Sequence, residues 1–201
     1  TDKWTWIYEA GGWDLMQKAF NKLNLKLLAT EIWGTEVMMS QKPFKSLEEM
    51  KNTKMRTSDP RMLSTYGVAG ITMPLEEVFT SMATGNVESA EFGYLKYNQD
   101  LGLVDVSKYG IWPDFWNCHF VTTVVVNKDE WNKLPKDLQL IIEMAFKSME
   151  QQHWTDGQYA SAVAMKELKE SGKMEFIRMD EKSFIEARKR MYQIVTRSAK
   201  I

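Results

Sequence analysis

The sequence has 201 residues, enough for one globular domain or for most of a two-lobed protein. Its 26 Lys and Arg against 27 Asp and Glu give a net charge of −1, so no basic surplus favours nucleic acid as a partner. A hydrophobic content of 44% excludes a disordered chain, and no apolar run is long enough for a membrane helix. The single cysteine, Cys118, excludes an intramolecular disulfide and a multi-cysteine zinc site.

Short helices and strands are predicted to alternate up to residue 92. From Trp13, apolar residues recur at helical spacing and predict a helix over about 13–24, followed by a strand over 25–33. Ser46 and Glu49 have the spacing of a capping box and predict a short helix. Further along we expect a strand at 54–57, a helix at 60–66, a strand at 71–72, a helix at 75–84 and a strand at 87–92.

The remaining residues predict one long helix between strands. A β-branched run at 121–126 predicts a strand buried on both faces. Helical spacing from 137 to about 171 predicts a long helix with a kink point at Gly157, and a strand at 175–178 leads to a last helix that begins at Asp180. Alternating units of this kind indicate an α/β fold with a parallel or mixed sheet flanked by helices.

Charged residues lie at predicted strand ends, where ligands of α/β sheets bind. Arg56 ends one strand, and its guanidinium can grip a carboxylate with two parallel hydrogen bonds. The alternative is a surface ion pair with Asp59. Glu91 and Phe92 end the next strand. Together with Glu36, which follows the strand at 25–33, Glu91 could supply oxygen ligands for calcium or sodium, although acids at strand ends are often simply solvated.

An aromatic loop precedes the β-branched strand. Trp112, Phe115 and Trp116 either cap the core or form the wall of a pocket that excludes water around Arg56. Asn117, in the same loop, offers an amide oxygen as a further cation ligand or hydrogen-bond partner. The loop is therefore a second candidate part of a binding site.

Catalysis has little support in the sequence. His119 adjoins Cys118, and neighbours on a strand point to opposite faces, so they do not form a nucleophile and base pair. His153 lies in the long helix among polar neighbours and is expected at the surface. The sequence has no Gly-rich phosphate loop and no serine-hydrolase motif.

Several segments, in this order, resemble the solute-binding proteins of TRAP transporters. They are residues 54–56, 70–79, 83–92, 126–128 and 134–139. The resemblance extends from about residue 6 to the last helix. Within that family, the chain is similar to the branch that binds 2-oxo and 2-hydroxy carboxylates with a cation, through residues 4–15, 34–36, 90–92 and 112–117.

The resemblance implies a periplasmic-binding-protein-like fold with two lobes and a long bracing helix. It implies that 34–122 forms the ligand-binding lobe and that 123–201 supplies a returning strand, the long helix and a C-terminal helix. Family members carry a further N-terminal stretch. Residues 1–201 are therefore expected to be the C-terminal two-thirds of such a protein.

The resemblance also implies roles for individual residues. Arg56 is expected to form a salt bridge with the substrate carboxylate, while Glu91 and the Phe92 carbonyl hold a bridging cation with Glu36 and Asn117. The branch usually has glutamine at position 36, tryptophan at 92 and an acid at 117. This chain has an acid at 36 and an amide at 117, the reverse of the branch, so the total charge of the two positions is the same. An alternative is that Glu36 meets an ammonium group of a zwitterionic substrate.

These features predict an extracytoplasmic, periplasmic protein that captures a small organic acid for the membrane permease subunits of a TRAP transporter. We expect no enzymatic activity. The rival hypotheses are a metal-dependent enzyme that uses Glu36 and Glu91 on a small carboxylate, and a helical interaction module. A homodimer formed through the long helix is a further expectation that the sequence leaves open.

Overall fold

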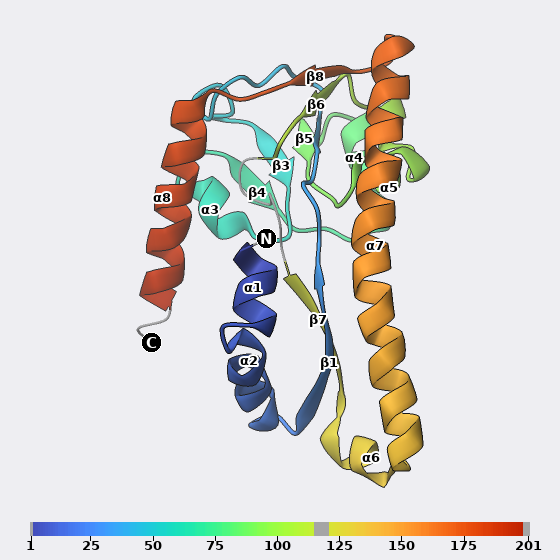
Figure 1. Ribbon diagram of the computed structural model, residues 1–201. Helices are drawn as coiled ribbons and strands as arrows, with labels where there is room; N and C mark the ends of the chain where they lie inside the picture. Colours follow the sequence, from blue (N-terminus) through green and yellow to red (C-terminus); the bar gives the residue numbers. More distant parts are fainter. Residues whose placement is uncertain (1, 115–120, 199–201) are drawn as a thin grey trace. The chain divides into compact units, whose positions relative to one another are not determined.

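The computed structural model describes residues 2–114 and 121–198 (Figure 1). The helices are α1 (Asp2–Tyr8), α2 (Gly12–Asn21), α3 (Pro60–Ser64), α4 (Leu75–Ala83), α5 (Leu95–Asp100), the 3₁₀ turn η1 (Leu103–Asp105), α6 (Lys128–Lys133), α7 (Lys136–Glu170) and α8 (Glu181–Ser198). The strands are β1 (Leu25–Ile32), β2 (Met38–Ser40), β3 (Lys54–Arg56), β4 (Ala69–Ile71), β5 (Ser89–Ala90), β6 (Tyr109–Ile111), β7 (Val121–Asn127) and β8 (Glu175–Ile177).

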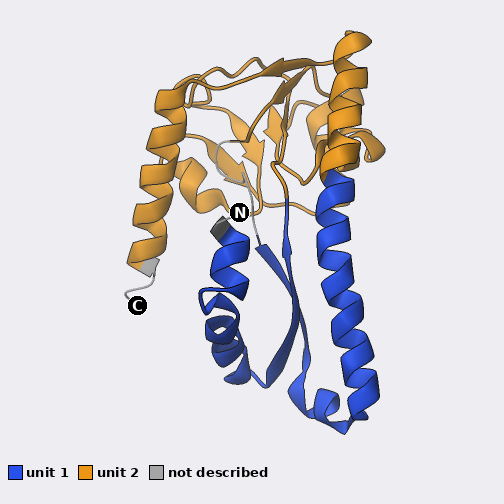
Figure 2. Ribbon diagram, in the orientation of Figure 1, with its two compact units in different colours: residues 1–33, 119–157 blue, residues 34–118, 158–201 orange. Residues whose placement is uncertain are grey.

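The chain divides into two compact units (Figure 2). Unit 1 comprises residues 1–33 and 119–157, and unit 2 comprises residues 34–118 and 158–201. Helix α7 contributes its first part to unit 1 and its second part to unit 2. The described residues that the sequence assigns to a ligand site all belong to unit 2.

Unit 2 is built on a six-stranded mixed sheet with the order β4-β3-β5-β2-β6-β8. Strand β3 is parallel to β4 and β5, β2 is antiparallel to β5 and β6, and β8 is parallel to β6. The carboxyl ends of β3, β5 and β6 therefore lie at the same edge of the sheet as the amino end of β2. This edge carries the candidate site.

Two hydrophobic cores hold the sheet of unit 2 between helices. Met38 of β2 belongs to one core, while its neighbours Val37 and Met39 belong to the other, as the two-residue period of a strand requires. The first core includes side chains from α3 and α8, and the second includes side chains from α4 and α7. Because a one-residue slip would exchange the two cores, this pattern fixes the register of β2.

Unit 1 is built on the antiparallel pair of β1 and β7. Their register places Leu25 opposite Asn127 and Ile32 opposite Val121, with one irregularity near Leu27. Asn127 then accepts hydrogen bonds from two backbone N–H groups of the first turn of α6. This amide cap ends β7 and begins the helix.

A buried carboxyl group links three elements within unit 1. Glu150 of α7 is buried and accepts hydrogen bonds from the Tyr8 hydroxyl and from the Thr30 backbone N–H, both at 2.5 Å. Burial raises the pKa of Glu150 and, more strongly, that of Tyr8. These hydrogen bonds join α1, β1 and α7. They also give the buried Glu150 carboxyl the polar partners without which its burial would be costly.

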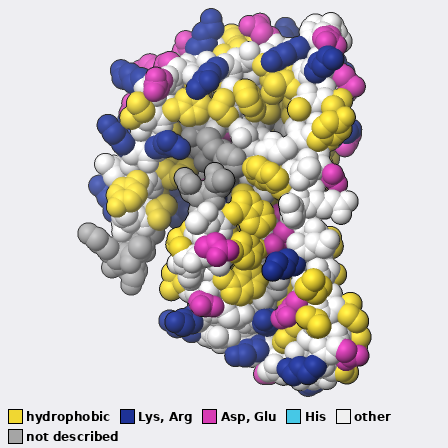
Figure 3. All heavy atoms as spheres, in the orientation of Figure 1, with side chains coloured by type: hydrophobic (Ala, Val, Ile, Leu, Met, Phe, Trp, Pro, Cys, Tyr) yellow, Lys and Arg dark blue, Asp and Glu magenta, His cyan; other side chains and the backbone are white. Residues whose placement is uncertain are grey.

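The molecular surface carries both signs of charge. In the face drawn in Figure 3, basic side chains and acidic side chains are interspersed, as the net charge of −1 leads one to expect. Exposed hydrophobic side chains lie among them. None of the described helices combines the length and the apolar character needed to cross a membrane.

The structure confirms most predicted elements. The helices at 13–24, 60–66, 75–84 and 137–171 correspond to α2, α3, α4 and α7, and the strands at 25–33, 54–57 and 175–178 correspond to β1, β3 and β8. The last helix begins as expected, because the Asp180 carboxylate accepts a hydrogen bond from the Ser183 backbone N–H at 2.6 Å. Strand β4 begins and ends earlier than the strand predicted at 71–72. Strand β5 is shorter than the strand predicted at 87–92.

Two predictions about local structure are wrong. Ser46 accepts a hydrogen bond from the Glu49 N–H, but the residues that follow form turns rather than a helix. Asn52, with φ of 61°, reverses the chain before a helix can extend. The strand at 121–126 exists as β7, but its side chains are mostly half-buried, because β7 has one partner strand in a two-stranded sheet.

The long helix also differs from expectation. His153 is half-buried rather than exposed, since its ring packs edge-on against Trp33 and pairs with the Glu31 carboxylate. Helix α7 itself is one continuous helix through Gly157, as the predicted helix over 137–171 requires.

Candidate functional site

Four residues from separate segments meet at the sheet edge where β3, β5 and β6 end. Arg56 is the last residue of β3, and it is paired with Ala90 of β5, which Glu91 directly follows. Glu36 precedes β2, and Asp114 follows β6. Because these strands are neighbours in one sheet, residues far apart in the sequence come together here.

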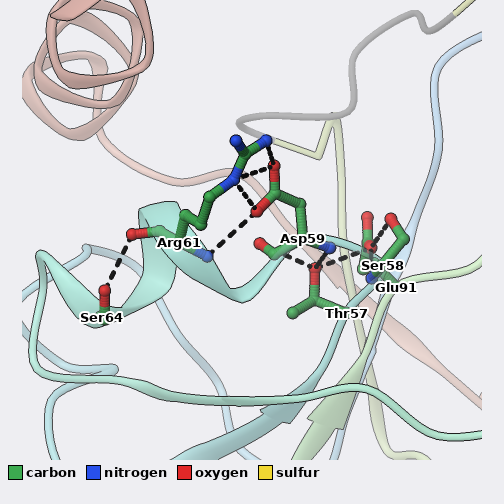
Figure 4. Close-up of polar contacts among 6 residues, drawn as sticks. All are labelled: Thr57, Ser58, Asp59, Arg61, Ser64 and Glu91. Carbon is green, nitrogen blue, oxygen red and sulfur yellow. Dashed lines mark hydrogen bonds and ion pairs between the residues drawn. The ribbon is translucent and has the colours of Figure 1, made fainter. Parts of the chain in front are cut away.

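Arg56 is held by a main-chain carbonyl and an aromatic ring. Its Nη1 donates a hydrogen bond to the Glu91 carbonyl oxygen at 2.6 Å, and its guanidinium carbon lies 5.5 Å from the centre of the Phe92 ring. Its buried Nε has no hydrogen-bond partner among the described residues. The alternative ion pair is not seen, since Asp59 pairs with Arg61 (Figure 4). Arg56 therefore retains donor capacity for a ligand.

The Glu91 carboxylate is fixed by the two residues that follow Arg56. Its Oε1 accepts hydrogen bonds from the Thr57 hydroxyl at 2.9 Å, the Ser58 backbone N–H at 2.9 Å and the Ser58 hydroxyl at 3.0 Å (Figure 4). Glu91 is 1% exposed. Three donors on one oxygen set the direction of the carboxylate before any ligand arrives.

Glu36, Glu91 and Asp114 form a buried cluster of carboxylates. One oxygen from each lies within 4.8 Å of the other two, and the residues are 3%, 1% and 0% exposed. The Asp114 backbone N–H donates to the Glu36 carbonyl at 3.2 Å, which ties their two segments together. Oε2 of Glu36 is buried with no hydrogen-bond partner among the described residues. A buried carboxylate with one unpartnered oxygen in such a cluster fits a site that holds a cation.

The electrostatics of the cluster favour a bound positive charge. Burial, first, and then the nearby carboxylates of Glu91 and Asp114 raise the pKa of Glu36, which reaches about 9. The Gly93 backbone N–H and the Arg56 guanidinium act in the opposite direction. With this raised pKa, the Glu36 carboxyl holds a proton at neutral pH, and a cation that binds to Glu36 must displace that proton.

The predicted aromatic wall is described in part. Of the predicted wall, Trp112 is 42% exposed, and its backbone N–H donates to the Ile177 carbonyl at 2.9 Å. The other predicted wall and ligand residues, together with the sequence's adjacent cysteine and histidine, lie outside the described residues: Phe115, Trp116, Asn117, Cys118 and His119.

The sequence reasoning missed Asp114. It assigned the last ligand position to Asn117, three residues further along the same loop. Strand β6 is only three residues long and was not predicted, so nothing identified Asp114 as an acid at a strand end. Only the pairing of Tyr109–Ile111 with β2 and β8 identifies β6, and that pairing has no local signal in the sequence.

The chain was compared with known protein families. The family of bacterial extracellular solute-binding proteins, family 7, named DctP, matches residues 1–200. The chain belongs to the DctP family. The description of this family is of extracellular solute binding, and it names no enzymatic reaction.

A curated relative has a name that specifies its ligand. The monocarboxylate 2-oxoacid-binding periplasmic protein of Nostoc sp. (strain PCC 7120) is 27% identical over 146 residues, which are 71% of this DctP chain and 40% of the relative. This chain spans about two-fifths of the length of the curated relatives it matches.

Solved structures confirm the predicted fold class. A TRAP periplasmic solute-binding protein of Colwellia psychrerythraea, with bound calcium and pyruvate, aligns with a TM-score of 0.87 at 20% identity, over 98% of this chain and 62% of that chain. A TRAP solute-binding protein of Bordetella bronchiseptica, a mixed-occupancy dimer with calcium and picolinate, aligns with a TM-score of 0.85 at 20% identity, over 96% of this chain and 58% of that chain. The DctP chain is thus an α/β protein of the periplasmic solute-binding fold.

Proposed function

We propose that this chain is part of an extracytoplasmic solute-binding protein of a TRAP-type transporter, which captures a small 2-oxo or 2-hydroxy carboxylate for uptake. The observation that carries the proposal is the partly satisfied guanidinium of Arg56, which lies beside the buried carboxylate cluster at the sheet edge. A guanidinium binds a carboxylate, and a cation among acids binds the carbonyl or hydroxyl oxygen next to it.

Arg56 is the group that grips the substrate carboxylate. Its Nη1 is already oriented by the Glu91 carbonyl and its face by the Phe92 ring, so little side-chain entropy is lost when a ligand binds. A charge-assisted contact of this kind contributes about 2–3 kcal/mol. Micromolar affinity needs about 8 kcal/mol, so other groups must contribute the rest.

A bridging cation supplies a second anchor. Glu36, Glu91 and the Phe92 carbonyl would hold it, with Asn117 as the further ligand implied by family resemblance. When bound, the cation attracts the 2-oxo or 2-hydroxy oxygen of the substrate. The relatives from Colwellia psychrerythraea and Bordetella bronchiseptica support calcium for this role, since both are described with calcium and a carboxylate.

The aromatic loop completes the site in this proposal. Trp112, Phe115 and Trp116 form its apolar wall and exclude water from the contact between Arg56 and the carboxylate. Exclusion of water strengthens that contact by lowering the local dielectric. No bond of the substrate is made or broken, and the protein releases the acid unchanged.

The protein captures the acid in the periplasm and releases it to the membrane permease subunits of the transporter. The family description as extracellular and the periplasmic name of the Nostoc relative support this location. A homodimer stays a prediction, supported by the description of the Bordetella bronchiseptica relative as a dimer.

The test is to identify the small molecule that the natural full-length protein carries. Native mass spectrometry of gently purified protein should show a small 2-oxo or 2-hydroxy acid, released on denaturation. A thermal-shift panel of pyruvate, lactate and alanine then separates the ligand classes. Stabilisation by alanine alone would favour a zwitterion that meets Glu36, and stabilisation by none of the acids would contradict the proposal.

The rival enzyme hypothesis gives a different result in the same assay. If Glu36 and Glu91 carried out acid and base chemistry, the added acid would disappear over time. Recovery of the acid unchanged after prolonged incubation is the outcome we expect.

A further inference from the structure

Helix α8 is fixed to unit 2 by one of its faces. Ala187 is a buried member of the first core, and Phe184, Met191 and Ile194 pack against that core. These four residues follow one another at intervals of three or four along the sequence, so they share one side of the helix. The residues between them are directed to its other sides.

Three large apolar side chains are exposed on α8, away from that core. Ile185 is 48% exposed, Tyr192 is 72% exposed and Val195 is 60% exposed. Their spacing places them on one side of the helix, and Arg188 and Lys189 lie between Ile185 and Tyr192 on the same side. These five residues are called the α8 stripe. Figure 3 shows hydrophobic and basic side chains together over α8.

The helix that carries the stripe is basic. It has five basic and two acidic residues, which gives a net charge of +3, whereas the whole chain has a net charge of −1. One pair of charges is internal, because Arg190 contacts Glu186. The exposed side chains of Arg188, Lys189 and Arg197 form no ion pair with an acid in the part of the chain that the structure describes. Their charge is available to a partner of opposite sign.

We propose that the α8 stripe docks on a membrane surface that contains anionic lipids. Arginine and lysine bind phosphate through charge-assisted hydrogen bonds, and each basic side chain near an anionic bilayer strengthens binding about fivefold. Apolar side chains enter the boundary between headgroups and acyl chains, and tyrosine favours the same depth. The stripe offers both kinds of contact along one helix.

A bilayer fits the stripe better than an acidic protein does. In a bilayer the phosphates lie above the acyl chains, so the long side chains of Arg188 and Lys189 can reach phosphate while Ile185 and Val195 enter the apolar layer. An acidic protein surface that matched the two cations would place these apolar side chains against charges. In addition, a helix side is convex, so a plane contacts it along its length, whereas a protein would need a matching groove.

This inference goes beyond the proposed function and does not depend on what Arg56 binds. Docking on a membrane confines the protein to the surface where a permease lies, which raises its effective concentration there. The proposed function would gain from this, but neither statement requires the other.

The test is sedimentation of the full-length protein with vesicles at low ionic strength. One set of vesicles contains phosphatidylcholine alone, and the other also contains phosphatidylglycerol. The wild type should bind only the anionic vesicles, and sodium chloride should release it because salt screens exposed charges. Equal binding to both sets, or binding to neither, would overturn the proposal.

Substitutions in the stripe assign the binding to α8. Arg188→Gln combined with Lys189→Gln should weaken binding to the anionic vesicles about 25-fold, since each lost charge costs about fivefold. Tyr192→Ser should weaken binding too, and what remains should still be released by salt. The matched control is Lys51→Gln combined with Lys133→Gln, which removes two exposed charges elsewhere and should bind like the wild type. Equal binding by the stripe variants and the control would overturn the assignment.

Two further measurements separate the alternatives. Polyglutamate represents an acidic protein partner, and binding to it without binding to anionic vesicles would overturn the proposal. Calorimetry with pyruvate should give the same affinity in the stripe variants as in the wild type. Absence of pyruvate binding in all of these proteins would count against the proposed function and leave the result with vesicles standing.

Discussion

Arg56 and Glu91 orient each other through two different sets of hydrogen bonds. The Arg56 guanidinium donates to the Glu91 main-chain carbonyl at 2.6 Å, while the residues directly after Arg56 hold the Glu91 carboxylate. The hydrogen-bonded pairing of β3 with β5 makes this possible, because it places Arg56 beside Ala90. The two groups to which the proposed function assigns the substrate carboxylate and the cation are thereby set side by side.

Arg56→Lys should weaken binding of the carboxylate strongly. Lysine keeps the charge but lacks the planar fork that makes two parallel hydrogen bonds, so we expect a loss of about 2–3 kcal/mol, or roughly 30- to 150-fold in dissociation constant. Calorimetric titration with pyruvate measures it. The matched control is Arg61→Lys, whose exposed side chain pairs with Asp59, and it should leave affinity unchanged. Equal affinity in both variants would remove Arg56 from the site.

Ser58→Ala should loosen the Glu91 carboxylate. The substitution removes one of three donors to Oε1, and a hydrogen bond to a charged group contributes about 1.5–3 kcal/mol. We expect a loss of about 1–2 kcal/mol in the free energy of unfolding by urea, and weaker calcium binding. Ser64→Ala is the control, since that exposed hydroxyl donates to the Arg61 carbonyl at 2.8 Å and not to Glu91 (Figure 4). If both variants behave alike, the hydroxyl of Ser58 has no special role.

The stability of the cation-free protein should fall as pH rises, relative to Glu36→Gln. The pKa of Glu36 is raised to about 9 from its usual value near 4.5, so between these pH values the folded state binds a proton that the unfolded state has lost. This bound proton stabilises the folded state near pH 5, and the stabilisation is lost as the pH rises toward 9. One pKa unit corresponds to about 1.4 kcal/mol, so the difference should be a few kcal/mol.

The measurement is urea unfolding in chelator at several pH values from 5 to 9. Glutamine cannot ionise, so the free energy of unfolding of Glu36→Gln should rise relative to that of the wild type as the pH increases across this range. Parallel curves for the two proteins would show that Glu36 is ionised in the folded state throughout.

Tyr8→Phe should destabilise unit 1 without affecting ligand binding in unit 2. The hydroxyl donates to the buried Glu150 carboxylate, and its removal leaves that oxygen short of a partner, at a cost of about 1–3 kcal/mol. Chemical denaturation measures the loss. Tyr159→Phe, at a residue that is 73% exposed, is the matched control and should be close to neutral. A loss of pyruvate affinity in Tyr8→Phe that matches its loss of stability would contradict the assignment of the site to unit 2.

Sequence patterns were sufficient for α2, α3, α4, α7 and α8 and for the strands with a clear hydrophobic pattern, but they did not predict α1, α5 or α6. Helix α7 keeps apolar residues at helical spacing over many turns, and Asp180 has the capping oxygen that begins α8. The three-residue strands β2 and β6 carry no period of their own. They exist because neighbouring strands pair with them, which is a tertiary effect.

The same limit explains the prediction of the site. Arg56 and Glu91 end strands that the sequence reveals, and the structure places them together. Asp114 follows β6, whose existence depends on pairing with β2 and β8, so no local signal marks it. The burial of Glu36 likewise depends on the packing of segments distant in sequence, which the pattern around residue 36 does not contain.

The most direct test of the central claim is calorimetric titration of the full-length wild type with a 2-oxo acid, once in calcium and once in chelator. If Arg56 and a cation held by the buried carboxylates together bind the acid, micromolar binding should appear in calcium and should be lost in chelator. Equal binding in both buffers, or no heat with any small carboxylate, would contradict it.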